Sequence, residues 1–147
     1  MTDLCALSFV YICCTVTLTV SGEDEFDVYH GGGVVFSARN WPNANTVTLD
    51  DACVLAIKTV NIADVLAGML ASTSTGVVTD ASWKCSAVNY SGWHLPGFND
   101  SSWRAARVKV ANNGFVWPIV AQINLEAQWI WSLYESDDIA YCRKILC

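Results

Sequence analysis

Short stretches in which polar and apolar residues alternate, separated by turn residues, run along most of this chain. Residues 15–20 (TVTLTV) and 46–49 (TVTL) alternate with a period of two, the spacing of a β-strand with one buried face. Residues 53–60 are almost continuously apolar, as expected for a central strand buried on both faces. Turn sequences such as the glycines at 31–33 separate these stretches, and no long amphipathic helix is indicated. The pattern predicts an all-β fold, an antiparallel β-sandwich.

Composition limits both the number of domains and the kind of partner. With 147 residues, 53% of them hydrophobic, the chain is long enough for one domain with a substantial core. It carries 14 acidic and 8 basic residues, a net charge of −6, and has no Lys or Arg before Arg39. Nucleic acid is therefore excluded as an expected partner, because phosphate binding needs a basic surface.

The N-terminal segment favours export. Residues 4–22 contain no charged side chain, and residues 4–12 have the length and apolar character of a signal-peptide core, although no positive charge precedes them. We predict a signal peptide at residues 1–14 and one domain at residues 15–147. Two alternatives are that the chain begins inside a longer extracellular protein and that the segment is an uncleaved anchor, the only case in which we expect a membrane as partner.

The cysteine pattern favours disulfides over a metal site. Four of the seven cysteines lie in the body of the chain, and no CxxC motif or Cys/His cluster occurs there, so structural zinc has little support. Cys53 is expected as a buried thiol in the central strand, and Cys147 as free, paired with Cys53, or joined to another chain. Asn89 and Asn99 each begin an N-x-Ser pattern for N-glycosylation, which agrees with a secreted glycoprotein.

Three strings in the carboxy-terminal half carry a family resemblance. They are GWHLPGFNDSSWRAA at 92–106, QWIW at 128–131 and YCRK at 141–144. The first string resembles the signature of galactose-binding-like jelly-roll domains, including the accessory sugar-binding domains of glycoside hydrolases such as rhamnosidases. Residues 18–29 resemble the opening of that group, a strand, an acidic turn and a second strand. The resemblance covers roughly residues 15–144 and implies a galactose-binding-domain-like jelly-roll sandwich. Asn99 stands where the family commonly has Asp.

The resemblance implies one disulfide, and side-chain chemistry and strand alternation suggest roles for other residues. Cys85 and Cys142 lie beside aromatic strands in motifs of the family pattern and are expected to form a disulfide. Asp100 and its neighbouring serines are expected to bond backbone amides of a turn, while Phe98 and Trp103 anchor that turn in the core. Trp129 and Trp131 should share one strand face, either as core or as a platform for a sugar ring.

Loops at one end of the sandwich are the expected ligand site, because aromatic rings stack on sugars and planar polar groups meet hydroxyls. The candidate ligand-binding residues are Trp41, Asn43, Tyr90, Trp93, His94 and Trp117. The acidic turn of Glu23, Asp24 and Glu25 is a candidate site for a structural calcium ion, with a solvated charged turn as the alternative. No other cofactor is expected.

We therefore expect a secreted or cell-surface, non-catalytic carbohydrate-binding module, lectin-like in its action, with a carbohydrate or glycoprotein as partner. The alternative is a structural or adhesion domain of the extracellular matrix or cell surface that binds protein and not sugar, because one fold hosts many functions. An enzyme is not expected: the chain has no nucleophile-elbow motif, no HExxH and no glycine-rich phosphate loop.

Overall fold

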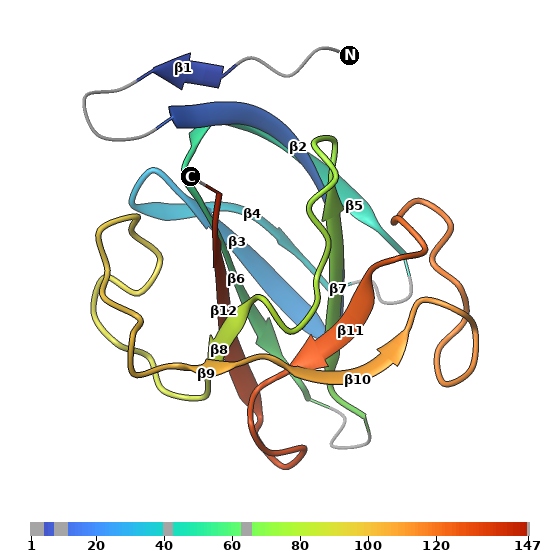
Figure 1. Ribbon diagram of the computed structural model, residues 1–147. Coiled ribbons are helices and arrows are strands. Elements are labelled where there is room, and N and C mark those ends of the chain that lie inside the picture. Colours follow the sequence, from blue (N-terminus) through green and yellow to red (C-terminus); the bar gives the residue numbers. More distant parts are fainter. Residues whose placement is uncertain (1–4, 8–11, 40–42, 63–65, 147) are drawn as a thin grey trace.

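The protein is an antiparallel β-sandwich of two sheets (Figure 1), described here from a computed structural model over residues 5–7, 12–39, 43–62 and 66–146. The first sheet has the order β1 (Cys5–Leu7), β2 (Ile12–Glu23), β7 (Gly68–Thr73), β11 (Gln128–Trp131), β10 (Arg107–Ala111), and β5 (Asn45–Ala52) also pairs with β2. The second has the order β4 (Gly33–Ala38), β3 (Glu25–His30), β6 (Val54–Val60), β12 (Ile139–Ile145), β8 (Lys84–Ser86), β9 (Arg104–Ala105). The predicted all-β sandwich is confirmed, and this arrangement is compatible with a jelly-roll-like fold. No helix among these residues has the length and apolar character needed to span a bilayer.

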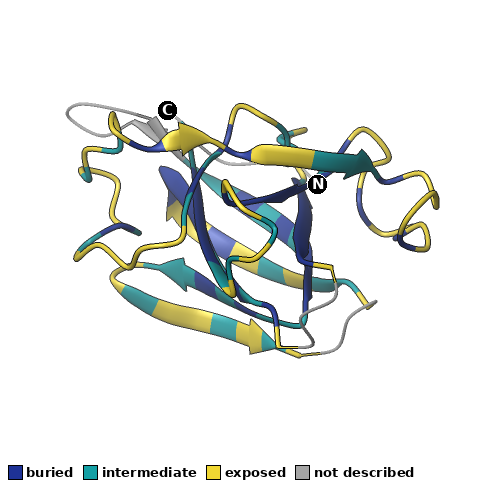
Figure 2. Ribbon diagram, turned by 90° about the horizontal axis from the view of Figure 1, so that it is seen from below, coloured by how far each residue is buried: buried dark blue, intermediate teal, exposed yellow. Residues whose placement is uncertain are grey.

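The main core lies between the two sheets, where Figure 2 shows the buried residues gathered. The alternation of β2 explains it: Val16, Leu18 and Val20 are buried, while the threonines between them are only partly covered. From the second sheet, Val28 and Ile57 meet them. Burying each such side chain stabilises the fold by about 1.5–3 kcal/mol before the entropy of ordering it is counted.

Strand β6 is central, as its continuous apolar sequence predicts. It lies between β3 and β12, with Ile57 opposite Val28 on one side and opposite Cys142 on the other. Ala56, the neighbouring residue, points to the outer face of the sheet and is also fully buried. Both faces of β6 are therefore covered at this point of the sheet.

Three details differ from the sequence-based expectations. The β-branched sequence of residues 77–79 (VVT) favours a strand, but these residues make only an isolated bridge between Ser72 and Val78. Cys53 precedes β6 instead of lying in it, and it is disulfide-bonded and not a thiol. Strand β2 begins at Ile12 and pairs with β1, so all of β1 and the start of β2 lie within the predicted signal peptide, residues 1–14. Removal of that segment stays a prediction.

Each sheet has a long loop packed on its outer face. Residues 87–103 cover the second sheet through the cluster of Trp93, Trp103 and Tyr141. Residues 112–127 cover the first sheet through Trp117 and Trp129. In Figure 1 the two loops lie on opposite sides of the sandwich, in yellow and in orange. The outer faces, which a simple sandwich leaves to solvent, thus hold two small aromatic cores.

Candidate functional site

Trp93 is part of the packing beneath the first of these loops. Its ring stacks on Trp103 with centroids 6.4 Å apart and meets the edge of Tyr141 at 5.2 Å and of Tyr29 at 5.1 Å. Only 2% of Trp93 is exposed. Too little of the indole surface is left for a sugar ring, so Trp93 acts as an anchor for the loop.

His94 lies beside this cluster and stacks on Tyr29, with ring centroids 4.9 Å apart. Its Nδ1 is buried and has no hydrogen-bond partner among the described residues. Burial lowers the pKa of His94 below its ordinary 6.5, so the imidazole is neutral at pH 7. Burial likewise raises the pKa of Tyr29 above 10.0.

The Phe98–Trp103 motif is held by an ion pair and not by backbone amides alone. The Asp100 carboxylate accepts hydrogen bonds from Arg143 on β12 and from Lys84 on β8, the latter at 3.2 Å. Burial favours the neutral acid, but these two cations outweigh it and hold the pKa of Asp100 below its usual 3.8. Asp100 was expected to bond turn amides together with its neighbouring serines; its backbone carbonyl accepts from the Trp103 amide at 2.9 Å, while the side-chain bond to a turn amide comes from Asn99 Oδ1, which accepts from Ser101 at 3.0 Å.

Trp117 plays the corresponding part in the second loop. Its ring stacks on Trp129 with centroids 4.4 Å apart, its Nε1 donates to Glu23 Oε2 at 2.6 Å, and Lys109 Nζ lies 5.1 Å from the ring centroid. Trp117 is 5% exposed. Trp129 belongs to this outer cluster whereas Trp131 joins the main core, so both tryptophans are core residues but they pack in different clusters.

The three acidic residues of the turn at 23–25 have separate partners. Glu23 accepts the Trp117 hydrogen bond, Asp24 Oδ2 accepts from the Ile62 amide at 2.7 Å, and Glu25 pairs with Arg39 at 2.9 Å. Burial raises the pKa of Glu23 above its ordinary 4.5, and the Trp117 hydrogen bond offsets only part of this. The carboxylates are not brought together, and within the described ranges no three His, Cys, Asp or Glu side chains form a group that could hold a metal.

The other predicted ligand residues are scattered. Asn43 is exposed, and Trp41 lies outside the described residues. Tyr90 is 47% exposed and lines a surface groove. Asn89 and Asn99 are both exposed; their glycosylation stays a prediction.

The groove that Tyr90 lines has a volume of about 290 Å³, and we call it the aromatic groove. It lies between the loop 87–103 and the loop that joins β11 to β12. Tyr134 from the latter loop is 62% exposed, so both tyrosine rings are available to a ligand. The residues that line it are Cys85, Ser86, Ala87, Tyr90, Ser102, Trp103, Arg104, Leu133, Tyr134 and Asp137.

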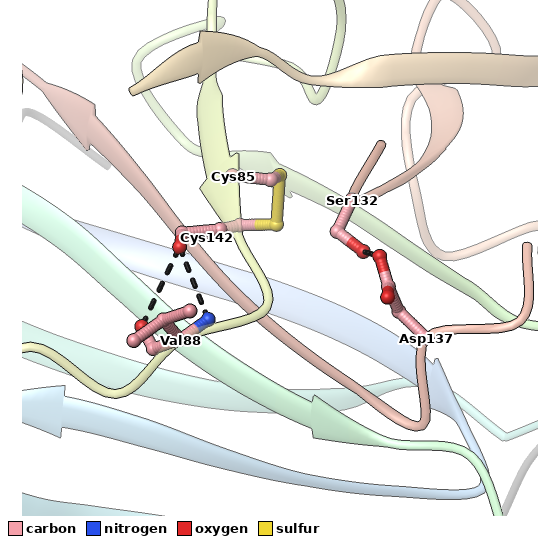
Figure 3. Close-up of a disulfide and its surroundings, with 6 residues drawn as sticks. Cys85, Val88, Ser132, Asp137 and Cys142 are labelled. Atoms are coloured by element: carbon pink, nitrogen blue, oxygen red, sulfur yellow. Dashed lines mark hydrogen bonds between the residues drawn. A yellow bond between two sulfur atoms is a disulfide. The ribbon is translucent and has the colours of Figure 1, made fainter. Parts of the chain in front are cut away.

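Hydrogen bonds fix the shape of the loop that carries Tyr134. Asp137 Oδ2 accepts from Ser132 Oγ at 2.6 Å and from the Tyr134 amide at 3.2 Å. The Asp137 carbonyl accepts from Trp131 Nε1 at 3.2 Å, which ties the loop to the main core. Figure 3 shows Ser132 and Asp137 pointing toward one another beside the disulfide. Tyr134 therefore stands on a braced turn.

The predicted disulfide is confirmed and forms part of the groove. Cys85 on β8 is directly opposite Cys142 on β12, and the two sulfurs are bonded (Figure 3). This bond attaches the short strand β8 to β12; Ser86, the last residue of β8, and Ala87 after it form part of the groove wall. The groove wall is thus fixed covalently.

Sequence reasoning missed Arg104, Leu133, Tyr134 and Asp137. Residues 132–137 (SLYESD) form a loop of ordinary composition between two strands, and only their position across from Tyr90 makes them part of a groove. The sequence signal that could have identified this loop is Tyr134, an aromatic residue in an otherwise largely polar segment. Comparison with protein-family models, with curated proteins and with solved structures gives no match to this chain.

Proposed function

We propose that this protein is a non-catalytic, extracellular carbohydrate-binding module, of the galactose-binding-like kind, whose ligand lies in the aromatic groove. The observation that supports this is the pairing of the exposed Tyr90 and Tyr134 with polar groups in one braced cavity. Sugar rings stack on aromatic faces, while their hydroxyls bond to hydroxyl, carboxylate and guanidinium groups. Ser86, Ser102, Arg104 and Asp137 supply those groups.

The extracellular location is supported by the disulfide pattern. The chain forms the disulfide Cys85–Cys142, and disulfides persist in oxidising compartments but are rare in cytosolic proteins. The apolar N-terminal segment and the exposed Asn89 and Asn99 agree with export. The prediction that the protein is no enzyme is part of this proposal and rests on the absence of catalytic motifs from the sequence.

A glycan array tests the proposal, with the purified protein applied once with calcium and once with a chelator. We expect binding to a limited set of glycans that is equal in both conditions, because the acidic turn uses its carboxylates internally. An array without signal, from protein shown to be folded by circular dichroism, would overturn the proposal. Binding lost with the chelator would instead reinstate a calcium site.

A second candidate function, adhesion to protein, is favoured by one observation. The loop 112–127 carries four exposed apolar side chains, of which Phe115 is 84% exposed. Exposed apolar groups of this kind often mark protein contacts. The other three are Val116, Ile119 and Leu125.

A further inference from the structure

A second cavity, of about 240 Å³, lies at the opposite end of β8 from the aromatic groove. Lys84, the first residue of β8, lines this cavity, whereas Ser86, its last residue, lines the aromatic groove. We call the second cavity the basic pocket. Its lining residues are Ser82, Lys84, Asp100, Arg143, Lys144 and Ile145.

The basic pocket is positive on a negative protein. Lys84, Arg143 and Lys144 line it with one carboxylate, that of Asp100, while the whole chain has a net charge of −6. Asp100 is ionised at neutral pH, since its pKa is held below 3.8, and it neutralises only one of the three cations. An anion would therefore be attracted to the excess positive charge of this lining.

The pocket also has donors to spare. Lys144 Nζ donates one hydrogen bond within the described structure, to Ser82 Oγ at 3.0 Å, although an ammonium group has three donors. Lys84 Nζ makes its two bonds to a single residue, the carbonyl and carboxylate of Asp100. The Arg143 side chain is fully buried between Asp100 and the Leu95 carbonyl, and its Nε has no partner among the described residues. The spare ammonium donor of Lys144, beside a lining in which cations outnumber the carboxylate, suits an oxyanion.

We infer that the basic pocket binds an oxyanion and, resting on the proposed function, that this oxyanion is a sulfate or carboxylate group of the same glycan whose neutral ring occupies the aromatic groove. The two sites are neighbours on β8, because Lys84 lines the basic pocket and Ser86, two residues further along the same strand, lines the aromatic groove. The ligand class is therefore an acidic oligosaccharide. Arg143 and Asp100 also hold the loop 87–103, so Lys144 is the residue whose change separates binding from folding.

The experiment uses three probes: a sulfated oligosaccharide, the same oligosaccharide without sulfate, and inorganic sulfate. Calorimetry at fixed ionic strength measures the two oligosaccharides, and amide NMR shifts at Ser82, Lys84 and Lys144 report inorganic sulfate. The variant is Lys144→Gln. The control, Arg39→Gln, removes one charge from an exposed pair with Glu25 on the far edge of the sheet.

We expect the sulfated oligosaccharide to bind roughly tenfold more tightly than the unsulfated one, the value of a charged hydrogen bond. Lys144→Gln should remove this preference and Arg39→Gln should keep it. Equal affinity for both oligosaccharides, or a preference that survives in Lys144→Gln, overturns the inference and leaves the proposed function standing. If neither oligosaccharide binds but inorganic sulfate shifts the pocket amides saturably, the oxyanion site stands and the proposed function fails; if sulfate gives no such shift, the inference also fails.

Discussion

The Glu23 carboxylate accepts a 2.6 Å hydrogen bond from the indole Nε1 of Trp117, joining the end of β2 to a loop that begins almost 90 residues later. The contact holds the loop 112–127 against the first sheet, where the Trp117 ring stacks on Trp129. It also determines how acid affects this part of the fold, because a buried carboxylate is easier to protonate than a solvated one.

The first prediction concerns pH. Burial raises the pKa of Glu23 in the folded protein, so its contribution to folding is greatest below its ordinary pKa of 4.5 and is lost as the pH rises through the folded-state value. We expect the free energy of unfolding of the wild type, relative to Glu23→Gln, to increase as the pH falls from neutral toward 4.5. Urea unfolding at several pH values measures this difference. A difference between the wild type and Glu23→Gln that stays flat over this pH range would contradict the assignment.

The second prediction concerns the ion pair of Asp100 with Arg143. Asp100→Asn leaves the buried guanidinium without its counter-charge, and we expect a loss of about 2–3 kcal/mol, below the usual 3–5 because Asp100 is partly exposed. Asp100 is stabilising above its ordinary pKa, and this stability is lost as the pH falls through the lowered folded-state value. The cost of Asp100→Asn should therefore shrink in strong acid. Denaturant unfolding at neutral pH measures this loss. An Asp100→Asn protein with the same unfolding midpoint as the wild type would contradict a stabilising ion pair.

The third prediction concerns the Cys85–Cys142 disulfide, which spans a sequence separation of 57. By chain entropy a bond closing a loop of that length stabilises the fold by roughly 4 kcal/mol. We expect Cys85→Ala, Cys142→Ala and the double variant to lose similar amounts, since any one change breaks the bond. Chemical denaturation of the three variants measures this. Losses that simply add in the double variant would mean that the two cysteines act independently.

The fourth prediction separates anchoring tryptophans from exposed aromatics. Trp93→Ala and Trp117→Ala should each lower the free energy of unfolding by about 3–5 kcal/mol, as large-to-small changes in cores do. Phe115→Ala, at a residue 84% exposed, should change it by less than about 0.5 kcal/mol. Thermal and urea unfolding provide the comparison. A Trp93→Ala protein as stable as the wild type would show that the loop 87–103 does not depend on that ring.

Particular residues explain what could be predicted from the sequence. The strands were predictable where one face is buried: in β2 the alternation of Val16, Leu18 and Val20 with threonines marks the inner face directly. The disulfide followed from the family resemblance. The long loops were not predictable, because a tryptophan in a polar loop is compatible with either an anchor or a ligand platform. Only the contact of Trp117 with Trp129, across sequence-distant elements, distinguishes the two.

The candidate site was the least predictable part for the same reason. Tyr90 could be proposed from the aromatic and polar composition of its loop. The tyrosine across the groove, Tyr134, comes from the connection between β11 and β12, about 40 residues away. The groove exists because the disulfide attaches β8 to β12 while Asp137 braces the neighbouring turn. Neither the spacing nor the periodicity of the sequence predicts that these two loops lie side by side. Asp100 illustrates the same limit, since its partner Arg143 is 43 residues distant.

The most direct test of the central claim compares Tyr134→Ala with Phe115→Ala for binding the strongest glycan of the array, by isothermal titration calorimetry. Both residues are exposed aromatics, and only Tyr134 lines the aromatic groove. We predict that Tyr134→Ala weakens binding by roughly tenfold or more while its unfolding curve stays that of the wild type, and that Phe115→Ala binds normally. Unchanged affinity in Tyr134→Ala, or loss of binding in Phe115→Ala alone, would contradict a carbohydrate site in this groove.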